Sequence, residues 1–126
     1  MIFIEDLLGV PYKLHGRDIR GYDCYGLVIE VLSRFGFPLS DLHSYTKETL
    51  TECFKKETSK VIKVCKLKKV LEPEESDILL FVDKGIGTHV GVYLEKNKFI
   101  HCDSLGVRIT NLNNYHKTWE AYRWQK

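Results

Sequence analysis

The sequence has no long hydrophobic run and little net charge, and each of these absences excludes a class of protein. No stretch approaches the roughly 20 consecutive apolar residues that a membrane-spanning helix needs. The net charge of +2 is too small to indicate a nucleic-acid partner or a membrane surface. Glu5 and Asp6 stand where a signal peptide would carry basic residues. We therefore predict no signal peptide and a chain that stays in the cytoplasm as synthesised.

Cysteine is scarce, and its spacing does not suit a metal site. The 4 cysteines form no CxxC pair and share no regular spacing with histidines, so we expect no structural zinc and no other cofactor. Without a secretory signal they need not form disulfides. The rest of the composition is that of an ordinary globular protein, with 44% hydrophobic and 29% charged residues. A length of 126 residues suits a single domain over residues 1–126.

Helical patterns occur in the N-terminal part of the chain. Ile2–Leu8 predicts a short helix that ends at Gly9. A second helix should begin after Asp23, a favourable N-cap residue, which places Cys24 in its first turn. The apolar residues that recur at helical spacing up to Gly36 are Leu27, Val28, Val31, Leu32 and Phe35.

The remainder of the chain changes from an ambiguous pattern to a strand pattern. Thr46–Glu57 indicates a helix, whereas Lys60–Leu67 leaves strand and helix both open. Helices followed by antiparallel strands are typical of an α+β domain, here N-terminal helices packed on an antiparallel sheet of about five strands. The predicted strands are Asp77–Asp83, Thr88–Leu94, Phe99–Cys102, Val107–Thr110 and Tyr122–Trp124.

A thiol at the start of a helix is well placed for nucleophilic chemistry. Free backbone N–H groups and the helix dipole favour the thiolate of Cys24, and the same groups could hold an oxyanion. A histidine that accepts the thiol proton would complete the nucleophile. Taken alone, a cysteine on a core helix is also explained as a buried apolar residue, and that explanation suits Cys53, Cys65 and Cys102.

Two of the 5 histidines lie at strand ends, where they could reach a helix N-terminus. His89 opens one strand and His101 ends the next, so one could act as a base while the other fixes its tautomer. If the hairpin turns near Asn97, residue 101 lies opposite residue 92 or 93 rather than opposite His89. The two histidines then meet only if the hairpin is twisted or bulged. The other three histidines lie in polar or turn-like contexts and are interpreted as structural.

Several segments, in the same order along the chain, carry a family resemblance. Together they resemble the NlpC-type cysteine peptidases, papain-like enzymes that cleave peptides of the bacterial cell wall. The match is colinear and covers nearly the whole chain, which makes it more specific than any single motif. The segments are Gly9–Tyr12 with Gly16, Tyr22–Val28, Asp77–Phe81, His89–Leu94, Asn97–His101, Gly106–Ile109 and Tyr122–Arg123.

The resemblance implies roles for four residues. Cys24 would be the nucleophile, His89 its general base, and His101 the residue that orients this base. Tyr12 would place its hydroxyl near the thiol, and the backbone N–H of Cys24 would stabilise the oxyanion. The implied reaction is cleavage of an amide bond in the stem peptide of peptidoglycan, after a γ-linked D-glutamyl unit, without a metal or organic cofactor.

Departures from the family pattern concern the surroundings of the thiol. The residue after the nucleophile is usually serine, whereas here it is Tyr25. Together with Gly16–Asp18 it resembles a branch found in phage tail proteins. Two alternatives therefore stand beside the cell-wall hydrolase: a phage tail assembly or structural module, and an acyltransferase or amidase with another substrate. The expected partners are peptidoglycan and phage tail proteins, reached within a virion, by lysis or by a non-classical export route.

Overall fold

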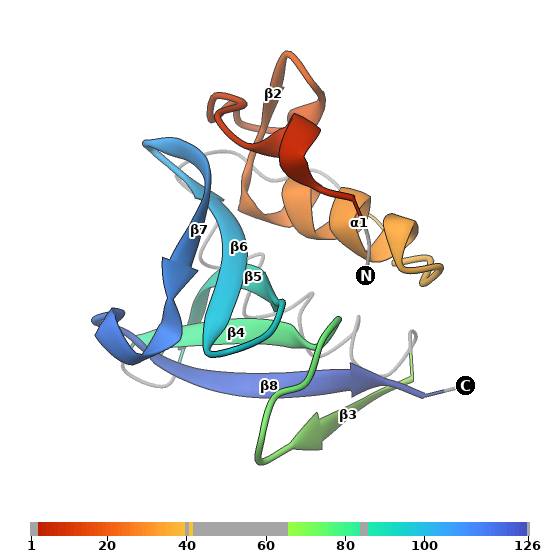
Figure 1. Ribbon diagram of the computed structural model, residues 1–126, viewed down its shortest axis with the longest axis vertical. Coiled ribbons are helices and arrows are strands. Elements are labelled where there is room, and N and C mark those ends of the chain that lie inside the picture. Colours follow the sequence, from red (N-terminus) through yellow and green to blue (C-terminus); the bar gives the residue numbers. More distant parts are fainter. Residues whose placement is uncertain (1–2, 40, 42–65, 84–85, 126) are drawn as a thin grey trace.

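The computed structural model describes residues 3–39, 41, 66–83 and 86–125, which form one α-helix, a small hairpin and a six-stranded antiparallel sheet (Figure 1). Among these residues no helix is long and apolar enough to cross a membrane. The elements are η1 (Glu5–Leu7), β1 (Arg17–Asp18), β2 (Gly21–Tyr22), α1 (Cys24–Arg34), β3 (Leu67–Val70), β4 (Ile78–Asp83), β5 (Ile86–Tyr93), β6 (Lys98–Asp103), β7 (Gly106–Asn111), η2 (Leu112–Asn114) and β8 (Thr118–Trp124).

Helix α1 lies against one face of the sheet and contacts β5 and β6 (Figure 1). The sheet has the strand order β3-β8-β4-β5-β6-β7, so β5 and β6 lie toward one side of it. Because side chains alternate along a strand, each strand contributes to two cores. The core beneath α1 contains Val92, Ile100 and Cys102, and the core on the opposite face contains Phe81 and Phe99.

The predicted helix α1 is confirmed, but the predicted N-terminal helix is wrong. The segment that we predicted as the helix Ile2–Leu8 forms only the 3-10 turn η1, and Ile2 lies outside the described residues. Ile4 supplies no side-chain hydrogen bond to cap a helix, and Leu8 is extended. Gly9 then has a φ of 86°, in the left-handed region, which turns the chain away. The described part of the fold is therefore mostly sheet with one helix, rather than several N-terminal helices on a sheet.

The five predicted strands are confirmed as β4 to β8, with ends shifted by at most four residues. A sixth strand, β3, pairs with β8 and was not predicted. It begins at Leu67, the last residue of the segment that left strand and helix open; that segment up to Cys65 lies outside the described residues, as does Thr46–Glu57. The hairpin of β1 and β2 was also missed, because short glycine-rich strands carry no clear alternation.

Candidate active site

Asp23 fixes the start of α1 and ties the preceding loop to it. Its side chain is fully buried, and Oδ1 accepts a hydrogen bond of 2.8 Å from the Gly26 N–H, as an N-cap residue does. Oδ2 accepts the backbone N–H of His15 at 2.9 Å. Arg17 donates to Oδ1 at 2.9 Å and to the Gly16 carbonyl at 2.8 Å. The carboxylate therefore holds the preceding loop against the first turn of the helix that carries Cys24.

Two glycines allow this loop to approach the helix so closely. A Cβ on Gly26 would lie 2.3 Å from the Gly16 carbonyl oxygen and 2.6 Å from an Arg17 nitrogen. A Cβ on Gly16 would lie 2.1 Å from the Gly21 carbonyl oxygen. Contacts this short with backbone atoms exclude any other residue without a shift of the chain. The glycine spacing around Cys24 is thus explained by packing of the loop on the helix.

Replacement of Asp23 with alanine should destabilise the fold by roughly 2–4 kcal/mol, because it removes a helix cap and leaves the backbone N–H groups of Gly26 and His15 without their acceptor. The measurement is the free energy of unfolding in urea at neutral pH. Asp18→Ala is the matched control, since Asp18 is an exposed residue paired with the exposed Arg20. An equal loss of stability in the two variants would contradict the capping account.

The thiol of Cys24 is buried and lies against the backbone of β5. Cys24 is 4% exposed, and its thiol has backbone hydrogen bonds with Val90 and Tyr25. Burial, and then the negative charge of Asp23, raises the pKa of the Cys24 thiol to about 12, although those backbone hydrogen bonds act to lower it. We expected the helix N-terminus to favour the thiolate. In this structure burial outweighs that effect, and the resting group is a neutral thiol.

His89 and His101 lie in direct contact. Nε2 of His89 is 2.8 Å from Nδ1 of His101, and the two rings are nearly perpendicular at 75°. Since Val90 follows His89 directly, the thiol of Cys24 and the imidazole of His89 are held by adjoining parts of β5. Nε2 of His89 is thus engaged by His101, and Nδ1 is the ring nitrogen that takes no part in this contact.

The register of the β5–β6 hairpin explains how the histidines meet. His101 pairs with Gly91, rather than with residue 92 or 93 as a turn near Asn97 would require. Residues 89 and 91 point to the same face, so His89 and His101 are diagonal neighbours on one face of the sheet. A register shifted by one residue would place them on opposite faces. Pairing between β5 and β6 covers only Gly91–Tyr93, and Cys24 contacts β5 just beyond it, at Val90.

Gly91 leaves room for the neighbouring strand β6, which carries His101. A Cβ at Gly91 would lie 3.0 Å from the Ile100 carbonyl oxygen, 3.1 Å from the Phe99 ring and 3.3 Å from Cβ of His101. Gly91→Ala should therefore push these groups apart, with a loss of stability of roughly 1–3 kcal/mol and a lower rate of any reaction that needs the pair. Urea unfolding and the NMR signals of the histidine rings measure the two effects. An unchanged stability and unchanged ring signals would show that the space is not needed.

Both histidines are neutral in this environment. Burial, followed by the positive charge of His101 and of Lys117, lowers the pKa of His89 to about 3. Burial lowers the pKa of His101 to about 4, while Asp103 acts in the opposite direction. His89 is 7% exposed and His101 is fully buried. The rings of Phe81, Phe99 and Tyr115 pack against the pair.

Tyr12, the fourth predicted site residue, lies within electrostatic range of the thiol. Burial raises the pKa of Tyr12 to about 12, and the next contributions come from Cys24 and Asp23. An isolated bridge pairs Tyr12 with Tyr22, two residues before the thiol. The structure thus joins His89 to His101, places the Cys24 thiol at Val90, the residue after His89, and places Tyr12 near Cys24. In the described part of the chain, no group of three or more histidine, cysteine or acidic residues is arranged to hold a metal.

The family can now be assigned by comparison with known proteins. The family model described as "NlpC/P60 family" matches residues 9–125. The chain belongs to the NlpC/P60 family. This is a family of cysteine peptidases, so the resemblance inferred from the sequence motifs is confirmed.

Among curated relatives of this NlpC/P60 chain are three bacterial proteins. The probable peptidoglycan endopeptidase LytE of Bacillus subtilis is 32% identical over 109 residues, covering 86% of this chain and 28% of that protein. Murein DD-endopeptidase MepS/Murein LD-carboxypeptidase of Escherichia coli is 32% identical over 110 residues, covering 86% and 50%. The probable endopeptidase NlpC of Escherichia coli is 33% identical over 122 residues, covering 93% and 68%. The chain thus spans no more than half the length of LytE and MepS.

Solved structures with the same fold include other NlpC/P60 domains. The NlpC/p60 domain of the peptidoglycan hydrolase SagA has a TM-score of 0.59 and 22% identity, covering 89% of this chain and 86% of that chain. NlpC2 from Trichomonas vaginalis has a TM-score of 0.64 and 20% identity, covering 96% and 44%. At this level of identity, the likeness establishes the fold.

Two residues beside the NlpC/P60 site were not found from the sequence. Thr110 lies with its Oγ1 2.8 Å from Nε2 of His101, and the Tyr115 ring packs against the rings of both histidines. Thr110 was predicted only as the end of a strand. Its signal was available in principle, because pairing of Thr110 with Phe99 places it on the same face as His101. That inference needs the register of two hairpins, which the sequence does not provide.

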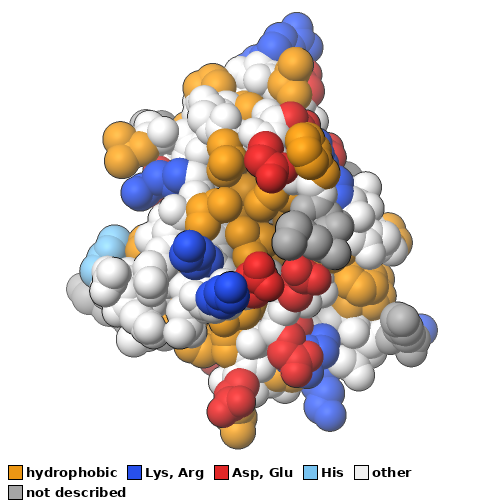
Figure 2. Space-filling view, in the orientation of Figure 1, with side chains coloured by type: hydrophobic (Ala, Val, Ile, Leu, Met, Phe, Trp, Pro, Cys, Tyr) orange, Lys and Arg blue, Asp and Glu red, His pale blue; other side chains and the backbone are white. Residues whose placement is uncertain are grey.

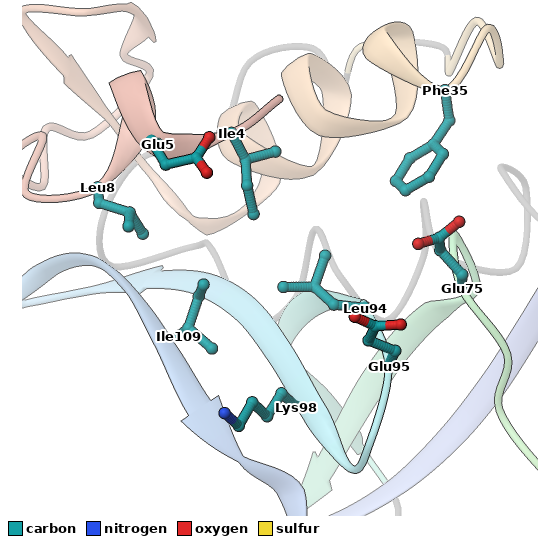
Figure 3. Close-up of a pocket in the computed structure, with 9 residues that line it drawn as sticks. All are labelled: Ile4, Glu5, Leu8, Phe35, Glu75, Leu94, Glu95, Lys98 and Ile109. Carbon is teal, nitrogen blue, oxygen red and sulfur yellow. The ribbon is translucent and has the colours of Figure 1, made fainter. Parts of the chain in front are cut away.

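One hollow of this NlpC/P60 chain lies apart from the site (Figure 3). It has a volume of about 300 Å³ and lies between the N-terminal segment, the end of α1 and the β5–β6 hairpin. On the molecular surface, seen in the orientation of Figure 1, hydrophobic side chains gather in the middle and charged side chains flank them (Figure 2). The lining consists of Ile4, Glu5, Leu8, Phe35, Glu75, Leu94, Glu95, Lys98 and Ile109, and includes none of the four predicted site residues.

Proposed function

We propose that this chain is a cysteine hydrolase that cleaves an amide bond in the stem peptide of peptidoglycan, after a γ-linked D-glutamyl unit. Cys24 is the nucleophile, His89 the general base and His101 the residue that orients His89. The observation that carries the proposal is the Cys24 thiol at the start of α1, held at the backbone of Val90, the residue that follows His89, whose Nε2 contacts a second histidine. The names of the relatives LytE and MepS support the peptidoglycan substrate.

The reaction follows from the neutral resting state of the site. As Sγ of Cys24 attacks the carbonyl carbon, its proton moves to Nδ1 of His89, and the oxygen becomes an oxyanion near the backbone N–H of Cys24. His89 then gives this proton to the leaving amine, the C–N bond breaks and a thioester remains. Water, deprotonated by His89, hydrolyses the thioester and regenerates the thiol. No step requires a metal or an organic cofactor.

A neutral histidine is suited to the first step. With a lowered pKa, His89 is unprotonated at neutral pH when substrate binds, as a general base must be. The thiolate then forms only together with the imidazolium. Tyr12 supports the same site, because its hydroxyl stays protonated and can donate a hydrogen bond near the thiol.

The test is incubation of the purified protein with defined muropeptides, followed by identification of the products by mass spectrometry. We expect a new amine and a new carboxylate at the bond after the γ-D-glutamyl residue. Peptides with an α-linked glutamyl residue are the matched control and should remain intact. Absence of cleavage by the folded protein across the whole panel would refute the hydrolase. Such an absence of cleavage would favour the structural module. Transfer of the acyl group to an added amine would instead favour the acyltransferase.

A further inference from the structure

Thr110 lies at the end of a row of three hydrogen-bonded side chains. Nε2 of His89 is 2.8 Å from Nδ1 of His101, and Nε2 of His101 is 2.8 Å from Oγ1 of Thr110. The three residues lie on the neighbouring strands β5, β6 and β7. His101 pairs with Arg108, so Thr110 is its diagonal neighbour, just as His89 is on the other side.

We infer that Thr110 is a positioning residue, whose hydroxyl oxygen accepts the Nε2–H of His101 and thereby fixes the tautomer that His101 presents to His89. This inference rests on the proposed function, in which His89 is the base for Cys24. It assigns a fourth member to the group formed by Cys24, His89 and His101.

The protons in the row can be placed in only two ways. A neutral imidazole carries one N–H, and a hydroxyl can either donate or accept. If His101 carries its proton on Nδ1, it donates to Nε2 of His89, and neutral His89 must carry its own proton on Nδ1. His89 could not then act as a base. If His101 carries its proton on Nε2, Thr110 accepts it, Nδ1 of His101 accepts from His89, and Nδ1 of His89 is open to the thiol proton.

The imidazolium stage of the reaction requires the second arrangement. Once His89 has taken the thiol proton, both of its nitrogens carry hydrogens, so its Nε2–H must find an acceptor. Nδ1 of His101 is that acceptor only when the His101 proton lies on Nε2, directed at Thr110. The hydroxyl thus holds His101 in the form that serves before and after proton transfer.

No other described neighbour takes this role from Thr110. Asp103 is the acidic group that acts on His101, but its carboxylate accepts hydrogen bonds from Nε and Nη2 of Arg108. Tyr115 meets the His101 ring edge to face, with ring centres 5.5 Å apart, so it contributes packing. The polar contact of His101 Nε2 in the structure is the Thr110 hydroxyl.

The experiment combines two substitutions with a direct reading of the tautomers. Thr110→Val keeps the branched shape of the side chain and removes the acceptor, whereas Thr110→Ser keeps the hydroxyl. Thr118→Val is the matched control, because it removes a hydroxyl bound to the Val82 carbonyl elsewhere in the sheet. The readouts are kcat and KM on the cleaved stem peptide, and the ¹⁵N shifts of the histidine rings in labelled protein. The ¹⁵N spectra also report whether each variant is folded.

We expect wild-type His101 to carry its proton on Nε2. In Thr110→Val the tautomer of His101 should change and kcat should fall roughly tenfold with little change in KM, well short of the ~10²–10⁴-fold supplied by a general base. Thr110→Ser should restore both. A wild-type His101 protonated on Nδ1, or a Thr110→Val protein with unchanged tautomer and kcat, would overturn the inference. If instead Cys24→Ala still cleaves, the proposed function fails, and the wild-type tautomer decides the role of Thr110 independently.

Discussion

Replacement of Cys24 with alanine should lower the rate of stem-peptide cleavage roughly a thousandfold or more, because no other described group can form the acyl intermediate. The thiol supplies the only new covalent bond of the proposed reaction, so its loss removes the whole pathway rather than one contribution to it. The measurement is kcat/KM on the peptide that the wild-type protein cleaves. Binding should change little, since alanine removes a single atom from a residue that is 4% exposed.

A matched pair of substitutions separates chemistry from packing. Cys24→Ser and Cys102→Ser make the same change at two buried cysteines on the same core. Cys102 donates to the Tyr22 carbonyl at 3.1 Å, and a serine can keep that hydrogen bond. We expect Cys24→Ser to be nearly inactive and Cys102→Ser to cleave at close to the wild-type rate. Comparable activity in Cys24→Ala and the wild type would eliminate the cysteine mechanism.

The helix and its nucleophile were predictable because the information is local. The capping residue Asp23, the apolar stripe of α1 and the position of Cys24 in its first turn all follow from a dozen consecutive residues, and the structure has the same helix. The predicted N-terminal helix was wrong for a related reason. Seven residues without a capping side chain, followed by Gly9, are too few to sustain a helix.

The contact between the two histidines was not predictable, because a shift of one residue in the pairing of β5 with β6 would abolish it. A hairpin that pairs His101 with Gly91 places His89 and His101 on one face, and a neighbouring register does not. Turn geometry decides between them: Lys96 and Asn97 both have positive φ, which fixes the centre of the loop. Thr110 was missed for the same reason, because its position beside His101 depends on the pairing of β6 with β7.

The charge state of the site was also beyond sequence reasoning. The helix N-terminus argued for a thiolate at Cys24, but the sequence does not show how deeply the thiol is buried. Once burial is included, the thiol and both histidines are neutral at rest. The arrangement therefore favours proton transfer during attack over a stored ion pair.

Burial of two neutral histidines should make the fold sensitive to acid. In the unfolded chain a histidine has a pKa near its usual 6.5, whereas the pKa is lowered to about 3 for His89 and about 4 for His101 in the folded protein. Between these values the unfolded state binds more protons, so stability falls as the pH drops below 6.5. The two groups together should cost roughly 2–4 kcal/mol of unfolding free energy between pH 7 and pH 5.

Urea unfolding of the wild type at pH 7, 6 and 5 measures this dependence, and one substitution assigns it. His89→Gln keeps a hydrogen-bonding side chain but binds no proton, so its stability should fall less steeply over the same range. His116→Gln is the control, because His116 is exposed and should leave the slope of the wild type unchanged. A wild-type stability that is flat from pH 7 to pH 5 would mean that the histidines bind protons in the folded state. The imidazolium would then exist before substrate arrives, and His89 would no longer be an unprotonated base at rest.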